Sequence, residues 1–214
     1  MTDMVIAVDG PAASGKGTLT HRLSEHFALA KLDTGLLYRS VGCKVLKEEG
    51  NPEDTVTAIA AAKALSFTDL DQEGLRSEEA GLAASKVAAL PDVRLVLLTF
   101  QRDFAVNPPE GTKGAVLDGR DIGTVVCPKA PYKLFLTASA EVRAERRFKE
   151  LQAKGVEAIY ARILRDIKDR DTRDSSRSVA PLEPAKDAFV LDTSELDADA
   201  VFSAALRYIN SQNS

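Results

Sequence analysis

Residues 10–18 read GPAASGKGT and directly follow the apolar run MVIAV at residues 4–8. The spacing G-x-x-x-x-G-K between an apolar run and a helix is typical of a loop that cradles phosphate groups. Gly10 and Gly15 permit backbone turns that a side chain would block. The freed backbone N–H groups then form an anion-binding nest at the start of the next helix, and Lys16 is placed to bridge the outer phosphates. The stretch therefore predicts a nucleoside triphosphate site.

A helix is expected after this loop, because Leu19, Leu23 and Phe27 recur at four-residue steps and form one apolar stripe. The end of the motif departs from its usual form, in which Ser or Thr follows the lysine and binds magnesium. Here Gly17 takes that position, and the hydroxyl comes one residue later, at Thr18. The ending GKGT is similar to that of small nucleoside monophosphate kinases, and it leaves the direct protein ligand of magnesium open.

Bulk composition bounds the class of protein. The 214 residues are enough for one domain with a full core and a small insert. Apolar residues make up 44% and charged residues 28%, which indicates a globular protein. A net charge of −4 and an aromatic content of 6% without Trp disfavour general adhesion to nucleic acid or to an anionic membrane. Cys43 and Cys127 are too few for a disulfide framework or a zinc cluster, so we expect reduced core thiols.

Targeting signals are not expected. No apolar stretch approaches the roughly 20 residues of a membrane span, and no basic-then-apolar leader precedes the first strand. These observations predict a cytoplasmic protein.

Short apolar runs alternate with helical patterns along the chain. The expected strands are residues 4–8, 29–32, 115–117, 133–136 and 189–191. Unbroken apolar strands separated by helices predict a five-stranded parallel sheet with helices on both faces. Ligands bind at the carboxyl ends of such strands.

Four of these runs end in an aspartate, namely Asp9, Asp33, Asp118 and Asp192. Each carboxylate either faces the site or caps the next helix. Capping is favoured for Asp192, because Thr193 and Ser194 follow it and a helix is expected over residues 198–209.

The chain reads as a single domain of 1–214, with a core at about 1–50, 80–140 and 185–214. A short insert at about 51–79 interrupts the alternation. Within it, residues 58–65 predict a helix, residues 65–70 a short strand with room for one hairpin, and residues 78–90 the helix that resumes the core. A helical lid is expected at about 141–184.

Residues 143–177 are basic within an acidic chain. They hold eleven Lys or Arg and seven Asp or Glu, a net charge of +4. One interpretation is a local anionic ligand, and the other is a solvated pair of helices with intrahelical pairs such as Arg162–Asp166. The run at 170–177 carries five charges within eight residues and predicts a mobile basic flap beside the site.

Arginines are the expected partners of a second phosphate-bearing ligand, because their planar fork grips phosphate oxygens at two points and keeps its charge. Arg39 lies in the helix after the second strand, and Arg120 follows the third strand. Both positions border the phosphate loop in a doubly wound sheet. Positioning and charge neutralisation carry most of a direct phosphoryl transfer.

Five stretches together resemble the bacterial cytidylate kinases. They are GPAASGKGT at 10–18, LDTGLLYR at 32–39, LDGRDIGTVV at 117–126, RDTRD at 170–174 and RSVAPL at 177–182, and they cover nearly the whole chain in order. The resemblance implies a P-loop kinase fold with a small NMP-binding insert and a basic lid. It also implies transfer of the gamma-phosphoryl group of ATP, with Mg²⁺, to CMP or dCMP.

Residue roles carried over from this resemblance fall into two sets. The donor set for ATP is Gly10, Pro11, Ala12, Ala13, Ser14, Gly15, Lys16, Gly17, Thr18, Arg143 and Arg147, with Arg146 beside them in the lid. The acceptor set for CMP is Asp33, Thr34, Arg39, Ser85, Arg94, Arg120, Asp121, Arg170, Asp174 and Arg177. Lys16, Arg39, Arg120, Arg170 and Arg177 are the expected catalytic residues.

Within the acceptor set, Asp121, Ser85 and Arg94 are expected to read the cytosine edge, since a carboxylate matches its amino group and an arginine its acceptors. Ser85 has a second interpretation, a helical serine that is merely exposed or bonded back to its own helix. Magnesium is expected near Thr18 and Asp118, held largely through water.

Other functions stay open at this point. A kinase of the same fold could act on UMP, AMP or a metabolite such as shikimate. A GTP-dependent switch requires Asn-Lys-x-Asp, which none of the asparagines begins. A nucleic-acid binder is opposed by the acidic balance and the few aromatic residues. The favoured reading is a monomer that acts on small nucleotides.

Overall fold

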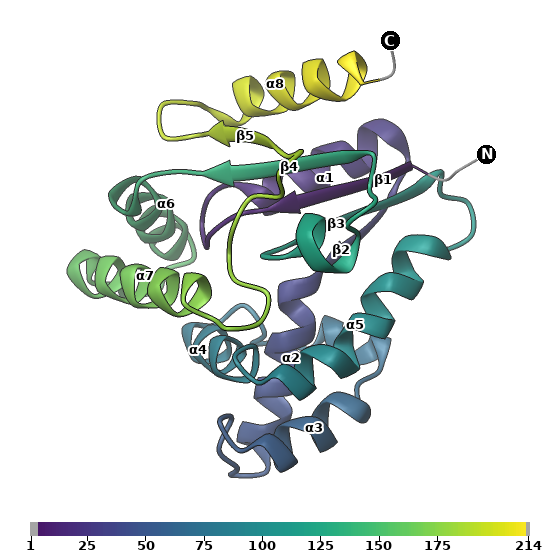
Figure 1. The fold of residues 1–214 in the computed structure, drawn as a ribbon. Coiled ribbons are helices and arrows are strands. Elements are labelled where there is room, and N and C mark those ends of the chain that lie inside the picture. Colours follow the sequence, from purple (N-terminus) through teal and green to yellow (C-terminus); the bar gives the residue numbers. More distant parts are fainter. Residues whose placement is uncertain (1–3, 213–214) are drawn as a thin grey trace.

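A computed structural model describes residues 4–212, with the side chain of Phe67 excepted. The expectation about a leader, and the outermost ends of the single-domain range, fall on residues 1–3 and 213–214, outside the described residues. Five strands form one parallel sheet in the order β2-β3-β1-β4-β5 (Figure 1). They are β1 (Met4–Asp9), β2 (Ala30–Asp33), β3 (Gly114–Gly119), β4 (Tyr132–Thr137) and β5 (Phe189–Asp192). The predicted sheet is confirmed, with strand ends shifted by one or two residues.

The register places the ends of the central strands level with one another. Asp9 at the end of β1 is paired with Gly119 of β3 on one side and with Phe135 of β4 on the other. Asp33 at the end of β2 is paired with Asp118. Because all strands run the same way, the loops that follow them gather at one edge of the sheet.

Helices cover both faces of the sheet (Figure 1). Side chains of a strand alternate between faces, so Ile6 and Val8 pack toward α1 (Lys16–Phe27) and α8 (Ala198–Ser211). Ala7 packs on the opposite face in a core shared with the four helices α2, α3, α4 and α5. These helices span Thr34–Lys47, Thr55–Lys63, Glu78–Val87 and Pro91–Val106 respectively.

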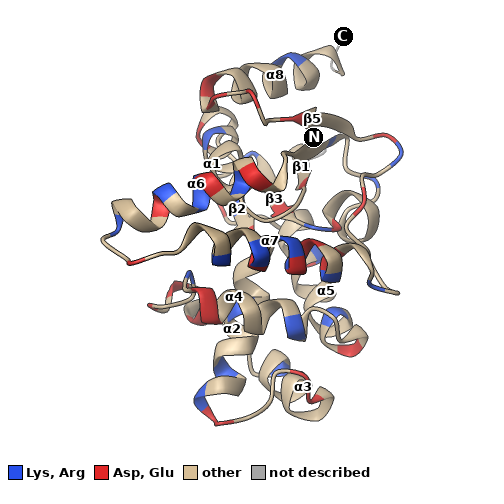
Figure 2. Ribbon diagram, turned by 90° about the vertical axis from the view of Figure 1, so that its left-hand side faces the viewer, with Lys and Arg blue, Asp and Glu red and all other residues tan. Residues whose placement is uncertain are grey.

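The remaining helices stand beside the sheet edge. α6 (Ala140–Ala153) and α7 (Tyr160–Ser175) pack together around a small core of Ala144, Leu151, Ile163 and Ile167. Figure 2 shows basic and acidic residues mixed along both helices. The expected intrahelical pair of Arg162 and Asp166 is present, with 3.9 Å between Nε and Oδ2.

The expected basic flap over residues 170–177 is largely helical, in agreement with the helical segment expected over about 141–184. Residues 170–175 are the last turns of α7, and the carboxylate of Asp174 in this stretch is buried. Charged side chains of this stretch contact one another, since Asp174 lies 3.9 Å from Arg170 Nε and also pairs with Arg177. The mobility of the flap stays a prediction.

The secondary structure of the insert at residues 51–79 differs from the prediction. Residues 65–70 were expected to form a strand, whereas the chain forms the single 3₁₀ turn η1 (Phe67–Asp71) and no strand occurs at 51–79 among the described residues. The cause is local hydrogen bonding: the backbone N–H of Ser66 donates to Asp69 Oδ2 at 2.8 Å. Lys44 of α2 pairs with the same carboxylate at 2.9 Å. This reciprocal cap favours a turn over an extended chain.

Asp192 does not cap α8, contrary to the prediction. Its Oδ1 accepts hydrogen bonds from the backbone N–H and the hydroxyl of Ser194, at 2.9 and 2.7 Å, and so closes a turn. The cap of α8 is Asp197, whose Oδ1 accepts from Ala200 N at 2.8 Å. Asp192 lies too far before the first helical turn to reach its N–H groups.

Two further features concern the thiols and the helices. Cys43 and Cys127 are free and only partly buried, and burial raises the pKa of Cys127 to about 11. None of the helices within residues 4–212 is long and apolar enough to cross a membrane.

Candidate active site

The phosphate loop is held in the form that its glycines predict. Gly10 has φ +148°, and a Cβ there would lie 2.1 Å from the carbonyl oxygen of Leu136. Gly15 has φ +94° and precedes the first turn of α1. Both conformations favour glycine. The N-terminus of α1 therefore opens into the space that the loop surrounds, as an anion site requires.

Lys16 points back into this loop. Its Nζ is buried and donates to the carbonyl oxygen of Pro11 at 2.7 Å. Burial, reinforced by the charge of Arg120, lowers the pKa of Lys16 to about 7, although Asp118 acts in the opposite direction. Bound phosphate would compensate this desolvated cation.

The aspartates at the strand ends have separate tasks. Asp9 accepts hydrogen bonds from the backbone N–H groups of Ile122 and Gly123, each at 2.7 Å, and burial raises the pKa of Asp9 to about 6. These donors begin the π-turn η2 (Ile122–Val126), which directly follows Asp121. Asp9 thus ties the loop that carries Asp121 to the strand that leads into the phosphate loop.

Asp118 and Asp33 face the cavity beside the phosphate loop. Asp118 accepts a hydrogen bond from Thr20 Oγ1 at 3.0 Å. Burial and then the nearby charge of Asp33 raise the pKa of Asp118 to about 6. Asp33 sits before the first residue of α2 without capping it through its side chain, and lies 3.8 Å from Arg76.

The cavity beside the phosphate loop is also lined by residues of α6 and α7, the two helices that lie toward the viewer in Figure 2. We call it the donor cavity. Its wall includes residues 12–18 of the loop, Asp33 and Asp118, and the arginines Arg39, Arg76, Arg120, Arg146, Arg147 and Arg170. Of the expected donor residues, Ala12 to Thr18 and Arg147 line it. Six guanidinium groups around a glycine-rich loop suit a polyanion.

Two arginines of α6, Arg143 and Arg146, differ in what they contact. Arg146 lines the donor cavity and donates to the carbonyl oxygen of Thr193 at 2.5 Å, while Thr193 Oγ1 lies 3.2 Å from the carbonyl oxygen of Ser14. Arg143, expected in the donor set, lines neither cavity described here. It is buried and paired with Asp171 of α7.

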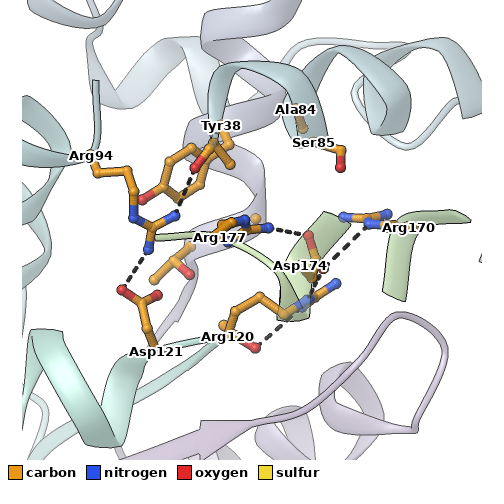
Figure 3. Close-up of a pocket in the computed structure, with 13 residues that line it drawn as sticks. Tyr38, Ala84, Ser85, Arg94, Arg120, Asp121, Arg170, Asp174 and Arg177 are labelled. Atoms are coloured by element: carbon orange, nitrogen blue, oxygen red, sulfur yellow. Dashed lines mark hydrogen bonds and ion pairs between the residues drawn. The ribbon is translucent and has the colours of Figure 1, made fainter. Parts of the chain in front are cut away.

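A second, narrower pocket adjoins the first (Figure 3). We call it the acceptor pocket. It is lined by Thr34, Gly35, Tyr38, Ala84, Ser85, Ala88, Arg94, Gly119, Arg120, Asp121, Arg170, Asp174 and Arg177. Gly35, Arg120 and Arg170 line both cavities, so the two spaces meet at these residues.

Asp174 organises the middle of the acceptor pocket (Figure 3). It accepts a hydrogen bond from Arg120 Nε at 2.8 Å and another from Arg177, and Arg170 Nε lies 3.9 Å away. Burial raises the pKa of Asp174, but the three arginines outweigh it and hold that pKa below its usual value. Three cations around one carboxylate leave an excess of positive charge.

The concentration of positive charge affects the pKa of one of these arginines. Burial, followed by repulsion from Arg120, lowers the pKa of Arg170 to about 9. The buried Nε atoms of Arg170 and Arg177 have no hydrogen-bond partner among the described residues. Buried N–H donors that lack a hydrogen-bond partner, beside several like charges, suit the binding of an anion.

The far end of the acceptor pocket carries the expected base-reading residues. Arg94 and Asp121 are paired at 2.5 Å, and each side chain is 8% exposed. Arg94 also donates to the carbonyl oxygen of Ala88 at 3.1 Å and lies over the ring of Tyr38. Ser85 lines the same pocket and is buried. Its Oγ accepts from Arg173 Nε at 3.2 Å, which argues against a merely exposed serine.

The other acceptor residues are distributed as follows. Thr34 Oγ1 donates to the carbonyl oxygen of Asp118 at 2.7 Å and lines the acceptor pocket. Arg39 and Asp33 line the donor cavity instead. Arg39 donates to the carbonyl oxygens of Leu75 and Ser77, at 2.7 and 3.0 Å, and so holds the end of the insert.

Several residues of the site were not predicted from the sequence, among them Tyr38, Arg76, Arg173 and Thr193. Tyr38 and Arg173 lie inside the quoted stretches LDTGLLYR and RDTRD, whose helical spacing was the available signal. Arg76 of the insert and Thr193 after β5 carry no motif, and only the folded chain brings them to the donor cavity or its loop.

Comparisons with known proteins identify the family of this chain. The family model described as cytidylate kinase matches residues 6–211. A cytidylate kinase of Paramagnetospirillum magneticum is 60% identical over 97% of this chain and 98% of its own length. One from Rhodospirillum rubrum is 55% identical over 95% of both chains.

Among solved structures, an uncharacterized protein from Eubacterium ventriosum aligns with 98% of this chain and 99% of its own. Its TM-score of 0.56 at 16% sequence identity supports the fold alone. The family match spans the residues that line both cavities and includes helices α6 and α7. The chain is therefore a kinase that belongs to the cytidylate kinase family.

Proposed function

We propose that this protein transfers the gamma-phosphoryl group of ATP to CMP or dCMP and releases ADP with CDP or dCDP. One observation carries the proposal. The donor cavity, which contains the phosphate loop, meets the acceptor pocket at Arg120 and Arg170, and that pocket ends at the buried pair of Arg94 and Asp121. This arrangement supports a path for phosphate that leads to a hydrogen-bond donor and acceptor suited to the edge of cytosine.

On the donor side, the backbone of residues 10–18 and Lys16 would hold the phosphates of ATP. Arg146 and Arg147 approach the same cavity from α6 and would contact the outer phosphates or the nucleoside. The lowered pKa of Lys16 would return toward its usual range once phosphate is bound, because an anion favours the charged form.

On the acceptor side, Arg120, Arg170 and Arg177 would bind the phosphate of CMP and the charge that develops during transfer. Asp174 holds the first and third of these by hydrogen bonds, and together with Arg170 it would contact the sugar. Thr34 lines the same pocket and would add a hydroxyl to the phosphate contacts, and Arg39 would join the phosphate after releasing the carbonyl groups that it now holds. No general base is required, because the attacking phosphate oxygen is already anionic.

At the base, Asp121 would accept from the cytosine amino group, and Arg94 and Ser85 would donate to its ring acceptors. The same arrangement disfavours uracil, whose O4 would face the carboxylate. One oxygen of the buried carboxylate would then lack a donor, which costs on the order of 1–3 kcal/mol. Specificity for cytosine over uracil is therefore proposed to rest on Asp121.

Magnesium fits the donor cavity as an ion held mainly through water. Asp118 and Asp33 line the cavity and supply carboxylate oxygens, and Thr18 adds a hydroxyl. No cluster of three or more metal-binding side chains occurs among residues 4–212. Mg²⁺ usually keeps several waters and binds through one or two carboxylates plus substrate phosphates. When bound, it neutralises phosphate charge.

We assign residues 141–184 as the lid over the transfer path and residues 51–79 as the nucleotide-binding insert. Closure of α6 and α7 over the cavities would exclude water, which competes with CMP for the phosphoryl group. A cytoplasmic monomer that acts on soluble nucleotides, and not on nucleic acid, is the form in which we expect it to work.

The deciding experiment is an acceptor panel. ADP release is measured with ATP and Mg²⁺ against CMP, dCMP, UMP, AMP, GMP and shikimate, with Asp121→Asn as the matched variant. We expect strong turnover with CMP and dCMP, weak turnover with UMP and none with shikimate. In Asp121→Asn, the ratio of CMP turnover to UMP turnover should be smaller than in the wild type. Preferred turnover of another acceptor would refute the proposal.

A further inference from the structure

Arg143 is a buried arginine that the proposed reaction does not use. It lies one turn into α6, on the helix that also presents Arg146 and Arg147 to the donor cavity. Its side chain is 5% exposed and lines neither cavity. A cation buried away from the ligand cavities requires its own explanation, because removing it from water is costly unless it is paired.

The guanidinium joins three separate parts of the fold. Nε donates to the carbonyl oxygen of Ala138 at 2.9 Å, at the end of β4. One terminal nitrogen donates to the carbonyl oxygen of Ala12 at 3.3 Å, within the phosphate loop. Both terminal nitrogens donate to the carboxylate of Asp171 in α7, at 3.0 and 2.5 Å. Four of the five N–H groups of an arginine are engaged in this way, so little capacity is left for a phosphate.

Asp171 occupies an informative place in α7. It follows Arg170 directly and precedes Asp174 by three residues in the same helix. Arg170 and Asp174 line the acceptor pocket. The two hydrogen bonds from Arg143 to Asp171 fix the position of this part of α7, and with it the positions of those two side chains.

We propose that Arg143 is a positioning residue that couples the donor loop to the acceptor pocket. Phosphate bound by the loop fixes the backbone at Ala12, and Arg143 transmits that constraint through Asp171 to α7. A filled donor cavity therefore raises the affinity of the acceptor pocket, and the reverse holds by the same factor. The inference rests on the proposed function, because it names CMP and ATP as the coupled ligands.

The test is a pair of equilibrium titrations. The Kd of CMP is measured by calorimetry without and with saturating Mg²⁺ and β,γ-methylene-ATP, which cannot transfer its phosphate. The ratio of the two values is the coupling factor. We expect about 5-fold or more for the wild type, as is usual for linked sites. Asp171→Asn should bring the factor close to 1, because an amide replaces one of the two accepting oxygens.

Two further variants keep the test decisive. Asp169→Asn removes an exposed carboxylate from the same helix and should leave the coupling factor unchanged. Arg143→Lys keeps the charge but lacks the planar fork, so it should also reduce the coupling. Both positioning variants should bind the ATP analogue alone with nearly the wild-type Kd.

The outcomes separate the competing explanations. A coupling factor that survives in folded Asp171→Asn and Arg143→Lys proteins would overturn the inference. So would a large loss of ATP-analogue affinity in Arg143→Lys but not in Asp171→Asn, because Arg143 would then bind the donor directly. A wild-type protein that binds the analogue but no CMP would instead refute the proposed function, and the inference with it.

Discussion

Arg94 and Asp121 form an ion pair of 2.5 Å at the closed end of the acceptor pocket, between helix α5 and the loop that follows β3. Both partners are buried, so each depends on the other for charge compensation. The pair also presents a donor and an acceptor side by side. A pyrimidine edge that carries the same two functions in reverse can bind there without leaving either charge unpaired.

Replacing Asp121 with Asn tests the acceptor half of this pair. We expect kcat/KM for CMP to fall by about 5- to 150-fold, the equivalent of roughly 1–3 kcal/mol. The value for UMP should change less, because an amide can donate to its O4. Steady-state rates for both acceptors at saturating ATP give the ratio. An unchanged ratio of CMP to UMP would contradict the role of Asp121.

Folding depends on the same pair. Arg94→Met leaves Asp121 buried and uncompensated, and should lower the free energy of unfolding by about 3–5 kcal/mol. The double variant Arg94→Met with Asp121→Asn removes both charges and should recover part of that loss. Urea unfolding of the three variants measures it. A double variant whose loss equals the sum of the two single losses would show that the residues do not interact.

Arg120 is expected to matter for turnover and little for stability. Its removal deprives the developing phosphate charge of a cation and should lower kcat by about 100-fold or more. Asp174 keeps Arg177 and Arg170, and the repulsion that lowers the pKa of Arg170 is relieved. Arg120→Ala is compared with Arg165→Ala, an exposed arginine of α7, by ADP release and thermal melting. Equal losses of activity and stability would contradict this role.

Lys16 gives a related expectation. Its ammonium group is buried and has no ion-pair partner within residues 4–212, and burial lowers its pKa to about 7. Lys16→Met therefore removes a costly charge, so the melting temperature should not fall, whereas turnover should be lost by about 100-fold or more. Lys149→Met on the exposed face of α6 is the control. Wild-type turnover in Lys16→Met would remove this lysine from the mechanism.

Asp9 predicts a pH dependence of stability. Burial raises its pKa to about 6 from an ordinary value of 3.8, so between these values the folded chain binds more protons than the unfolded chain. The free energy of unfolding must then fall as pH rises from about 4 to 6, by up to roughly 3 kcal/mol for this group. Below about pH 4 the group contributes no further change.

Asp9→Asn isolates this contribution, since Asp118 titrates in the same range in both proteins. Urea unfolding at pH 4 and pH 7 gives the two free energies for each protein. The wild type should lose roughly 2 kcal/mol more than the variant between the two pH values. Parallel losses in both would show that Asp9 is ionised at no cost in the folded chain.

Local patterns predicted the sheet, the phosphate loop and most helices, because apolar periodicity and glycine spacing are properties of neighbouring residues. The turn at Phe67–Asp71 was missed, because its cap depends on Lys44 from another helix as well as on Ser66 and Asp69. The placement of Arg143 was missed for a similar reason. Its partners Ala12 and Asp171 are remote in sequence, and only the folded chain brings them together.

The acceptor pocket shows the same division. Spacing and resemblance identified Arg120, Arg170 and Asp174 as site residues, and the structure brings all three together in one pocket. The hydrogen bond between Arg173 and Ser85 joins α7 to α4, and no sequence pattern in either helix predicts it. Such contacts depend on how α6 and α7 pack against the rest of the fold, which no local sequence pattern specifies.

The two outer strands of the sheet have a consequence for the protein in concentrated solution. β2 and β5 are each only four residues long, and each ends in an aspartate. Exposed Lys31 adds a charge in the middle of β2. Short, charged edges offer few unpaired backbone groups to a neighbouring molecule. The sheet is thereby protected from growing by strand addition, and the chain can remain dispersed at the concentrations that a working enzyme reaches.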